Sequence, residues 1–334
     1  MFRVFVLFAL FTIIMSQGVP KEGPIFEEYQ RFLKRYNKTY SNLGEMERRY
    51  NVFSANFNHT KKNSTFGVTK FSDMTQEEFK KKYLKFNTTN LAALNSTKKW
   101  YNETQIAERK KGLRFLQEEG VPATWDWRDQ GVVNEIQNQG SCGGCWAFAT
   151  IANLEGVYAK KNGYLPKYSE QQLIDCDPYN TGCDGGIMGS AYDYLKTSGI
   201  QSEVSYPYIE ATNFCSYDPS QANAIVADYI SAGTTDEEYI KEMLYTNGPL
   251  AITINANTLQ YYTGGVLSIS YDECPYAPSH GVNLVGYGTD EYGVDFWIVR
   301  NTWGPDWGEN GYFRLARGYG LCGVNMYVVS AVLN

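Results

Sequence analysis

Seven cysteines constrain the fold of this 334-residue chain more than any other feature of its sequence. All seven lie in the C-terminal two-thirds, beginning at Cys142. The basic residue Arg3 follows Met1 and Phe2 and precedes a twelve-residue apolar run from Val4 to Met15. Because a membrane-spanning helix needs about 20 apolar residues, this run predicts a cleaved secretory signal over residues 1–18, with an uncleaved anchor as the alternative.

A secretory route changes how the cysteines are interpreted, because disulfides persist in oxidising compartments. Six cysteines can pair, and the sequence leaves fifteen pairings open. The seventh sulfur is then either an intermolecular bridge or a reactive thiol. A composition of 43% hydrophobic and 15% aromatic residues predicts a packed globular protein around this framework.

The stretch QGSCGGCWAF, residues 139–148, holds Cys142 and Cys145 in Cys-x-x-Cys spacing. A redox pair at this spacing is typical of a thioredoxin-like βαβ unit, which the surrounding sequence lacks. A zinc site needs four ligands, usually as two close pairs, and the chain has only one Cys-x-x-Cys. Both kinds of site remain as alternatives to a reading in which one of the two sulfurs is a nucleophile.

Cys145 begins a mostly apolar, helix-compatible run that Gly163 ends. Its sulfur is therefore predicted at a helix N-terminus, where unpaired N–H groups and the helix dipole favour a thiolate. A buried structural thiol is the other interpretation. The chain contains only two histidines, and His59 lies in the N-terminal region, so His280 is the candidate base for a Cys145 nucleophile.

Charge divides the chain near residue 120. Residues 17–120 contain 20 Lys and Arg against 12 Asp and Glu, a net charge of +8, whereas residues 121–334 contain 9 against 24, a net charge of −15. A basic segment of this kind usually binds an acidic partner. Since the segment has no nucleic-acid recognition motif, we expect its partner to be the acidic part of the same chain, and no nucleic acid.

Six Asn-x-Ser/Thr sequons precede residue 120 and none follows it, which predicts a glycosylated, solvent-facing N-terminal region. A polar stretch from Phe86 to Lys111 reads as an exposed linker. The sequons begin at Asn37, Asn58, Asn63, Asn87, Asn95 and Asn102.

Local patterns predict helices first and strands later along the chain. Apolar residues at helical spacing follow Pro24, and a second helical pattern runs from Leu43 to about Asn58. Capping-box patterns begin further helices at Ser169 and at Thr235. The later runs PLAITIN, GVNLVGYG, DFWIVRN and GYFRLAR are short and rich in β-forming residues. This order favours an α+β protein with two subdomains.

Three motifs together resemble the papain family of cysteine proteases: QGSCGGCWAF, SHGVNLVGYG and RNTWGPDWGENGYFRL. His280 lies 135 residues and Asn301 lies 156 residues after Cys145, close to the spacing of that family. The resemblance implies a papain-like two-subdomain α+β fold, with a helical left subdomain and a β-barrel-like right subdomain. It also implies an inhibitory propeptide over residues 19–120 and a peptidase domain over residues 121–334.

The resemblance assigns a role to each residue that matches the family motifs. Cys145 corresponds to the nucleophile, His280 to the general base and acid, and Asn301 to the side chain that orients the imidazole. Gln139 corresponds to the oxyanion-hole donor beside the backbone N–H of Cys145, and Trp303 to an indole that shields the His–Asn hydrogen bond from water. A neutral amide suffices as the orienting group because the imidazole already carries the proton.

The family also implies a disulfide pairing and a substrate-binding site. It pairs Cys142 with Cys183, Cys176 with Cys215, and Cys274 with Cys322, which leaves Cys145 as the odd sulfur. Gly185 and Gly186 are expected to hydrogen-bond the substrate backbone. The pocket for the side chain two residues before the cut is expected to be lined by Ile187, Met188, Thr253, Gly281 and Tyr327.

The pocket residues include no carboxylate, so we expect apolar or aromatic side chains to be preferred there over arginine. No histidine-bearing occluding loop is recognisable, which favours endopeptidase over exopeptidase activity. The sequence departs from the family pattern at four positions near the site, none of which removes a catalytic group: Gly144, Asp184, Ser279 and Thr302.

The N-terminal region resembles the inhibitory propeptide of cathepsin L-like enzymes, with Glu45, Arg49, Phe53 and Asn56 among the matching positions. This predicts a monomeric zymogen that processes itself near Val121 at acid pH. Its expected partners are protein substrates, its own propeptide and cystatin-type inhibitors, with no cofactor and no metal. Its expected destination is a lysosome, a vacuole or the extracellular space. The rival interpretation is a catalytically inactive papain-like binding or structural protein.

Overall fold

The computed structural model describes residues 22–86, 120–223, 226–232 and 235–334, and it divides the chain into two compact units. The first unit comprises the described residues up to Phe79 together with Gln260–Thr263, and the second comprises Lys80–Leu259 and Gly264–Asn334. The predicted signal, the sequons at Asn87, Asn95 and Asn102, and most of the predicted linker lie outside the described residues.

The first unit is built on two helices, α2 (Pro24–Arg35) and α3 (Leu43–Thr60), as the sequence patterns predict. Proline stands at the start of α2, where its missing N–H has no helical partner to lose. The Asn42 side chain caps α3 by accepting a hydrogen bond from Glu45 N. The helices bury an aromatic core of Tyr29, Phe32, Tyr50 and Phe53, with ring centroids of neighbouring pairs 5.0–6.1 Å apart.

An ion-pair network joins α3 to the start of helix α4 (Gln76–Tyr83) within the first unit. The Arg49 guanidinium contacts Glu45 at 2.7 Å and Glu78 at 2.8 Å, and Arg48 contacts the same two carboxylates. Hydrogen bonds from both guanidinium groups lower the pKa of Glu45. Partial burial would raise the pKa of Glu78, but hydrogen bonds from the Thr75 backbone N–H and the same arginines lower it.

Four residues from far along the chain belong to the first unit. Thr69 Oγ1 donates to Gln260 O at 2.6 Å, Tyr261 OH donates to Asn56 Oδ1 at 3.2 Å, and Gln260 Nε2 donates to a backbone oxygen of the unit. Of the three sequon asparagines that lie in this unit, Asn37 and Asn58 are exposed and Asn63 is half-buried.

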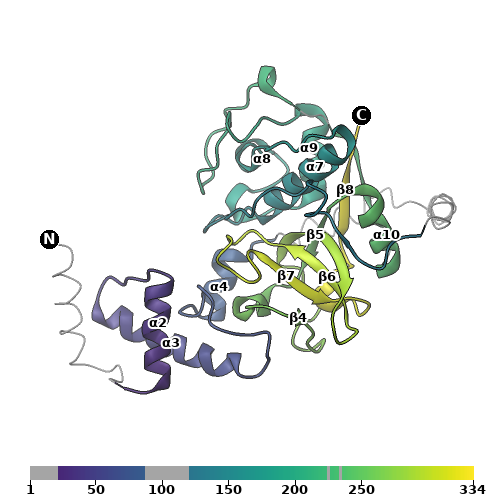
Figure 1. Ribbon diagram of the computed structural model, residues 1–334. Coiled ribbons are helices and arrows are strands. Elements are labelled where there is room, and N and C mark those ends of the chain that lie inside the picture. The colour runs from purple at the N-terminus through teal and green to yellow at the C-terminus, as the bar shows by residue number, and fades with distance from the viewer. Residues whose placement is uncertain (1–21, 87–119, 224–225, 233–234) are drawn as a thin grey trace. The chain divides into compact units, whose positions relative to one another are not determined.

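Three helices, drawn in teal in Figure 1, form one part of the second unit: α7 (Cys145–Asn162), α8 (Glu170–Cys176) and α9 (Met188–Ser198). Gly163 ends α7 in the left-handed conformation, φ 70°, that glycine adopts without cost. Ser169 caps α8 by accepting from Gln172 N, as its capping pattern predicts. α7 packs against α8, against α9 and against the sheet of the same unit.

The other part of the second unit is a mixed sheet in the order β2-β8-β3-β5-β6-β7-β4, with β1 paired to β5. The pairs are antiparallel except for β4 with β7. The strands are β1 (Trp125–Asp126), β2 (Val226–Ser231), β3 (Leu250–Ile254), β4 (Val266–Leu267), β5 (His280–Thr289), β6 (Asp295–Arg300), β7 (Tyr312–Ala316) and β8 (Val328–Leu333). The described residues of this unit also form helix α10 (Glu237–Asn247) and the short 3₁₀ turns η2 (Gly182–Asp184), η3 (Pro219–Gln221) and η5 (Leu321–Gly323). A further 3₁₀ turn, η4 (Asn257–Tyr261), has its first three residues in this unit and its last two in the first unit.

The structure corrects one capping prediction. Helix α10 is capped by the Asp236 side chain, which accepts from Glu238 N, and not by Thr235. Asp236 has the extended backbone that a capping residue needs, one position later than the pattern predicts. The four strand-like runs form β3, β5, β6 and β7, which confirms the α+β class.

Four strands of the sheet were not identified from the sequence: β1, β2, β4 and β8. β8 is the most consequential of them, because it pairs with both β2 and β3 and its residues share the buried core with α7. No helix within the described ranges is long and apolar enough to cross a bilayer.

Candidate active site

The candidate nucleophile, Cys145, is the first residue of α7 and has no exposed surface. The backbone N–H groups of Gly281, Trp146 and Cys145 itself act to lower the pKa of its thiol, against the effect of burial. A side chain at Gly281 would have its Cβ 3.1 Å from Cys145 O, so the start of β5 lies directly against the start of the helix. Because His280 precedes Gly281 in the chain, this contact places His280 beside the start of α7.

The candidate base, His280, is fully buried at the first position of β5. Its Nε2 lies 2.8 Å from Asn301 Oδ1, which also accepts from the Thr302 backbone N–H at 2.8 Å. Because a backbone N–H donates to it, this atom of Asn301 is the amide oxygen, and His280 Nε2 must donate to it as well. The neutral ring therefore carries its proton on Nε2. Its Nδ1 is an unprotonated, buried nitrogen with no hydrogen-bond partner among the described residues.

Two tryptophans enclose the His280–Asn301 pair. The Trp303 ring stacks on the His280 ring, with centroids 4.8 Å apart and planes inclined by 28°. Trp307 meets Trp303 edge-on at 4.9 Å, and both indoles are essentially without exposed surface. The aromatic wall keeps water from the His280–Asn301 hydrogen bond, which strengthens it.

Gln139 is fully buried and its amide is held at both ends. Its Nε2 donates to Cys142 O at 3.0 Å, and its Oε1 accepts from the Thr302 hydroxyl. The amide orientation is thereby fixed, with nitrogen on the side of the Cys142–Cys145 loop. Thr302 is a residue of the candidate site that the sequence indicated only as a departure from the family pattern. Its position next to Asn301 was the signal that pointed to it.

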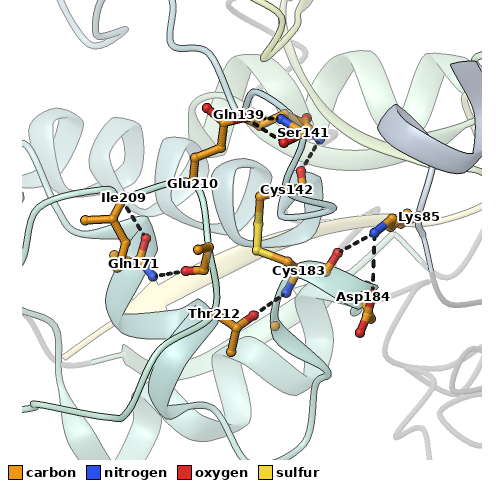
Figure 2. Close-up of a disulfide and its surroundings, with 12 residues drawn as sticks. Lys85, Gln139, Ser141, Cys142, Gln171, Cys183, Asp184, Ile209, Glu210 and Thr212 are labelled. Carbon is orange, nitrogen blue, oxygen red and sulfur yellow. Dashed lines mark hydrogen bonds and ion pairs between the residues drawn. A yellow bond between two sulfur atoms is a disulfide. The ribbon is translucent and has the colours of Figure 1, made fainter.

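The structure forms three disulfides, Cys142–Cys183, Cys176–Cys215 and Cys274–Cys322, the pairs that the family resemblance implies. Cys145 is the free cysteine. Cys142 is thus bonded to Cys183 and is neither a redox partner of Cys145 nor a zinc ligand. The Cys142–Cys183 bridge joins the loop before α7 to η2 (Figure 2). Gly143 N also donates to Cys183 O at 2.9 Å.

The five predicted pocket residues are almost without exposed surface and come from separate elements. Ile187 and Met188 begin α9, Thr253 and Gly281 face each other across β3 and β5, and Tyr327 precedes β8. The Tyr327 hydroxyl accepts from Gly189 N at 3.0 Å. Thr253 Oγ1 is buried with no hydrogen-bond partner among the described residues.

The two predicted substrate-binding glycines follow η2. Gly185 has a φ of 116°, a backbone conformation that favours glycine. A Cβ on Gly186 would lie 2.6 Å from the Trp146 ring and 2.7 Å from the Asn180 side chain. A larger residue would therefore strain the backbone at Gly185 and would displace neighbouring side chains at Gly186.

A short stretch of the second unit, Tyr83–Phe86, crosses between these elements. Lys85 Nζ lies 3.3 Å from Cys183 O and 3.4 Å from the Asp184 carboxylate (Figure 2). Phe86 N donates to Ser279 O at 3.2 Å, and the Phe86 side chain is 7% exposed within the apolar cluster that contains Trp146. Tyr83 meets Trp303 edge-on at 6.4 Å. The stretch therefore contacts both the η2 side and the β5 side of the candidate site.

The burial of the site determines the ionisation of its two central groups. Burial raises the pKa of Cys145 to about 11, although the N–H groups around its sulfur act in the opposite direction. Burial lowers the pKa of His280 to about 4, although its hydrogen bond to Asn301 favours the proton. The covered site therefore holds a neutral thiol and a neutral imidazole, where the sequence predicts a thiolate. Desolvation outweighs the helix terminus in this state.

Comparison with known proteins matches two family models to the chain. The model of the papain family cysteine protease matches residues 121–332. The model of the cathepsin propeptide inhibitor domain matches residues 29–79.

Curated relatives align along nearly the whole chain. Cathepsin F of Drosophila melanogaster is 35% identical over 319 residues, covering 91% of this chain, which spans 50% of that protein. The probable cysteine protease RD19D of Arabidopsis thaliana is 37% identical over 332 residues, covering 91% of this chain and 85% of that protein.

Solved proforms share the fold. The proform of Amb a 11 cysteine protease, a major ragweed pollen allergen, superimposes with a TM-score of 0.79 at 34% identity, covering 93% of this chain and 95% of that one. Digestive procathepsin L 3 from Tenebrio molitor larval midgut gives a TM-score of 0.75 at 32% identity, covering 93% and 100%. With a family model over most of its length and relatives above 30% identity, the chain belongs to the papain family of cysteine proteases, as a cysteine endopeptidase with a cathepsin-type propeptide inhibitor domain.

Proposed function

We propose that the chain is an autoinhibited precursor of a secretory-pathway endopeptidase in which Cys145 is the nucleophile and His280 the general base and acid. The observation that carries the proposal is the fixed tautomer of His280. Asn301 and Thr302 hold the ring proton on Nε2, which leaves Nδ1 as an acceptor beside the helix that begins at Cys145.

Once the site is open, proton transfer from Cys145 to His280 Nδ1 forms a thiolate–imidazolium pair. The thiolate attacks the scissile carbonyl carbon and the carbonyl π electrons move onto its oxygen. As the tetrahedral intermediate collapses, the C–N bond breaks and His280 donates its Nδ1 proton to the leaving amine. A water molecule, deprotonated by His280, then attacks the thioester, which releases the carboxylic acid and restores the sulfur.

Negative charge develops on the carbonyl oxygen, and two donors are available to it. One is the backbone N–H of Cys145, at the positive end of α7. The other is Gln139 Nε2, which donates one hydrogen to Cys142 O and has a second to offer. Thr302 supports this role, because its hydroxyl holds Gln139 Oε1 and so directs Nε2 toward the site.

We propose that residues Tyr83–Phe86 help to keep the precursor inactive. Their contacts with Cys183, Asp184 and Ser279 support this role, as does the neutral state of the buried thiol. The buried dyad carries one proton on sulfur, and the open ion pair carries that proton on the ring. Since the two states bind the same number of protons, the dyad itself gives opening no pH dependence near neutrality.

Acid activation must therefore depend on other groups, and the carboxylates of the first unit are suited to it. The pKa values of Glu45 and Glu78 are lowered, so their ion pairs with Arg48 and Arg49 stabilise the unit above the ordinary value of 4.5. That stabilisation is lost as the pH falls through the lowered values. Protonation also weakens the attraction between the +8 and −15 parts of the chain.

The proposed specificity follows from the pocket residues. Ile187, Met188 and Tyr327 supply apolar walls and none of the five pocket residues is acidic, which favours an apolar or aromatic side chain two residues before the cut. A peptide-library profile dominated by arginine at that position would contradict this.

Acid incubation of purified precursor, followed by N-terminal mapping and a peptide-substrate assay, tests the whole proposal. We expect cleavage near Val121, consistent with a family match that begins at residue 121, and peptidase activity that appears with it. Labelling by a thiol-directed active-site probe should require Cys145. A matured wild-type chain that neither cleaves peptides nor takes the probe would favour the inactive binding protein. A Cys145→Ala precursor that still matures alone would refute self-processing.

Secretion, glycosylation at the six sequons, a monomeric state, inhibition by cystatin-type proteins and delivery to a lysosome, vacuole or the extracellular space belong to the same proposal. Treatment of secreted material with a glycosidase that removes N-linked glycans, followed by peptide mapping, identifies which sequons carry glycans.

A further inference from the structure

Glu210 adopts a backbone conformation that disfavours any residue other than glycine. Its φ is 59°, in the left-handed region, where a side chain with a Cβ is strained. Of the residues in the described ranges, only Asn37, Asn310 and Cys322 share this feature without being glycine. A strained residue persists only where its surroundings hold it, so the contacts of Glu210 compensate for its strain.

The contacts of Glu210 lie on the loop that precedes the nucleophile. Its Oε1 accepts from Ser141 N at 2.5 Å and from Ser141 Oγ at 2.7 Å (Figure 2). A Cβ on Gly140 would lie 2.1 Å from the Glu210 carboxyl carbon, so the carboxylate occupies the space that the absent side chain leaves. The strained backbone and Gly140 together place this carboxylate on the loop between Gln139 and Cys142.

The residues on either side of Glu210 reach the same part of the site. Tyr208 OH donates to Gln139 O at 2.7 Å, and Thr212 Oγ1 accepts from Cys183 N at 2.9 Å. We call residues 208–212 the clamp segment. It thus bonds to both loops that the Cys142–Cys183 disulfide joins, as Figure 2 shows.

The clamp segment is itself anchored to α8. Gln171 Oε1 accepts from Ile209 N at 3.0 Å, and Gln171 Nε2 donates to Ala211 O at 2.7 Å. Gln171 is buried, so the two bonds that flank Glu210 come from a fixed amide. The clamp segment is therefore held by the helical part of the unit and acts on the loop before α7.

We propose that Glu210 is a positioning residue for the oxyanion hole: its carboxylate fixes the Gln139–Cys142 loop through Ser141, and its left-handed backbone is retained for that contact. The inference rests on the proposed role of Gln139 as an oxyanion donor. Glu210 does not contact the reacting atoms. It acts on the loop whose Cys142 carbonyl receives the Gln139 amide.

Three substitutions separate positioning from backbone strain. Glu210→Ala removes the carboxylate and keeps the strain, whereas Glu210→Gly removes both. Glu210→Gln keeps an acceptor oxygen for Ser141. Glu291→Ala, which makes the same chemical change at an exposed residue in the turn after β5, is the matched control.

Each variant is made as the full precursor, matured, and assayed on a fluorogenic peptide amide with phenylalanine two residues before the cut. We expect Glu210→Ala and Glu210→Gly to lower kcat about tenfold with KM unchanged within twofold, because a misplaced donor weakens transition-state and not substrate binding. Affinity for a peptide aldehyde, which forms a tetrahedral adduct, should fall by a similar factor. Glu210→Gln should stay within about threefold of wild type, and Glu291→Ala should equal it.

Hydrogen exchange gives a readout that does not depend on catalysis. We expect faster exchange in the peptide containing residues 139–145 for Glu210→Ala and Glu210→Gly, while Glu210→Gly melts no lower than wild type. Unchanged kcat and unchanged exchange in both variants would overturn the inference, and so would losses in Glu210→Gly that track a lowered melting temperature. Gln139→Ala separates the two proposals. If Gln139→Ala loses activity and the Glu210 variants do not, only the role of Glu210 fails. If Gln139→Ala loses none, the oxyanion assignment fails too.

Discussion

Burial of Cys145 in the precursor should make its sulfur almost unreactive toward alkylation at neutral pH. With a pKa of about 11, the thiolate fraction at pH 7 is about one in ten thousand, compared with roughly 3% for an ordinary cysteine. The rate of alkylation follows this fraction, because the thiolate is the nucleophile. We therefore expect reaction with iodoacetamide at pH 7 to be at least about 300-fold slower than for an exposed thiol.

The slope of the pH profile is more diagnostic than the rate at one pH. In the precursor, the alkylation rate should rise about tenfold per pH unit from pH 6 to pH 10, the sign expected for a raised pKa. After maturation the thiolate–imidazolium pair should make the rate nearly constant from about pH 5 to pH 8. Steric shielding by residues Tyr83–Phe86 would lower the alkylation rate of the precursor by the same factor at every pH, so it does not change this slope.

Removing the contacts of the stretch Tyr83–Phe86 tests whether burial by this stretch raises the pKa of Cys145. Lys85→Ala combined with Phe86→Ala deletes the contacts with Cys183 O and Asp184 and the buried aromatic ring. This double variant should flatten the precursor profile toward the mature one, whereas Lys81→Ala, at an exposed position of α4, should not. Mass spectrometry of the Cys145 peptide measures the rate. A precursor whose Cys145 reacts at pH 6 as fast as the mature enzyme would refute the reasoning.

Three further predictions concern the site and its control. Thr302→Val removes the hydroxyl that holds the Gln139 amide and should lower kcat about tenfold at constant KM. Thr302→Ser keeps the hydroxyl and should retain most of the activity. A rise in KM that accompanies the loss of kcat in Thr302→Val would contradict the proposed role. Asn301→Ala removes the acceptor that fixes the His280 tautomer and should lower kcat/KM by about ten- to a hundredfold, measured across pH 4–9, and an unchanged profile would count against tautomer control. Glu78→Gln weakens the ion pair with Arg49, which contributes at most about 1 kcal/mol at a partly exposed site. The precursor should therefore mature at a higher pH than wild type, with maturation followed by gel electrophoresis. An unshifted midpoint pH of maturation would exclude this carboxylate from the acid response.

The candidate catalytic residues could largely be predicted from the sequence, because the chain contains few residues of the types that the chemistry needs. The chain has two histidines and an odd cysteine, so His280 and Cys145 were the natural pair once the N-terminal region was set aside. The helix that begins at Cys145 was equally legible, because its apolar run ends at a glycine that the left-handed cap requires. Periodicity likewise revealed the aromatic faces of α2 and α3.

What the tertiary structure decided were the contacts between distant segments. No local pattern pairs Thr302 with Gln139, or Glu210 with Ser141, because hydrogen bonds between loops depend on where the fold brings each chain segment. The neutral state of the Cys145 thiol also depends on the tertiary structure. A helix N-terminus favours the thiolate and is visible in the sequence, but the desolvation that opposes it comes from residues folded over the sulfur, and only their placement sets its size.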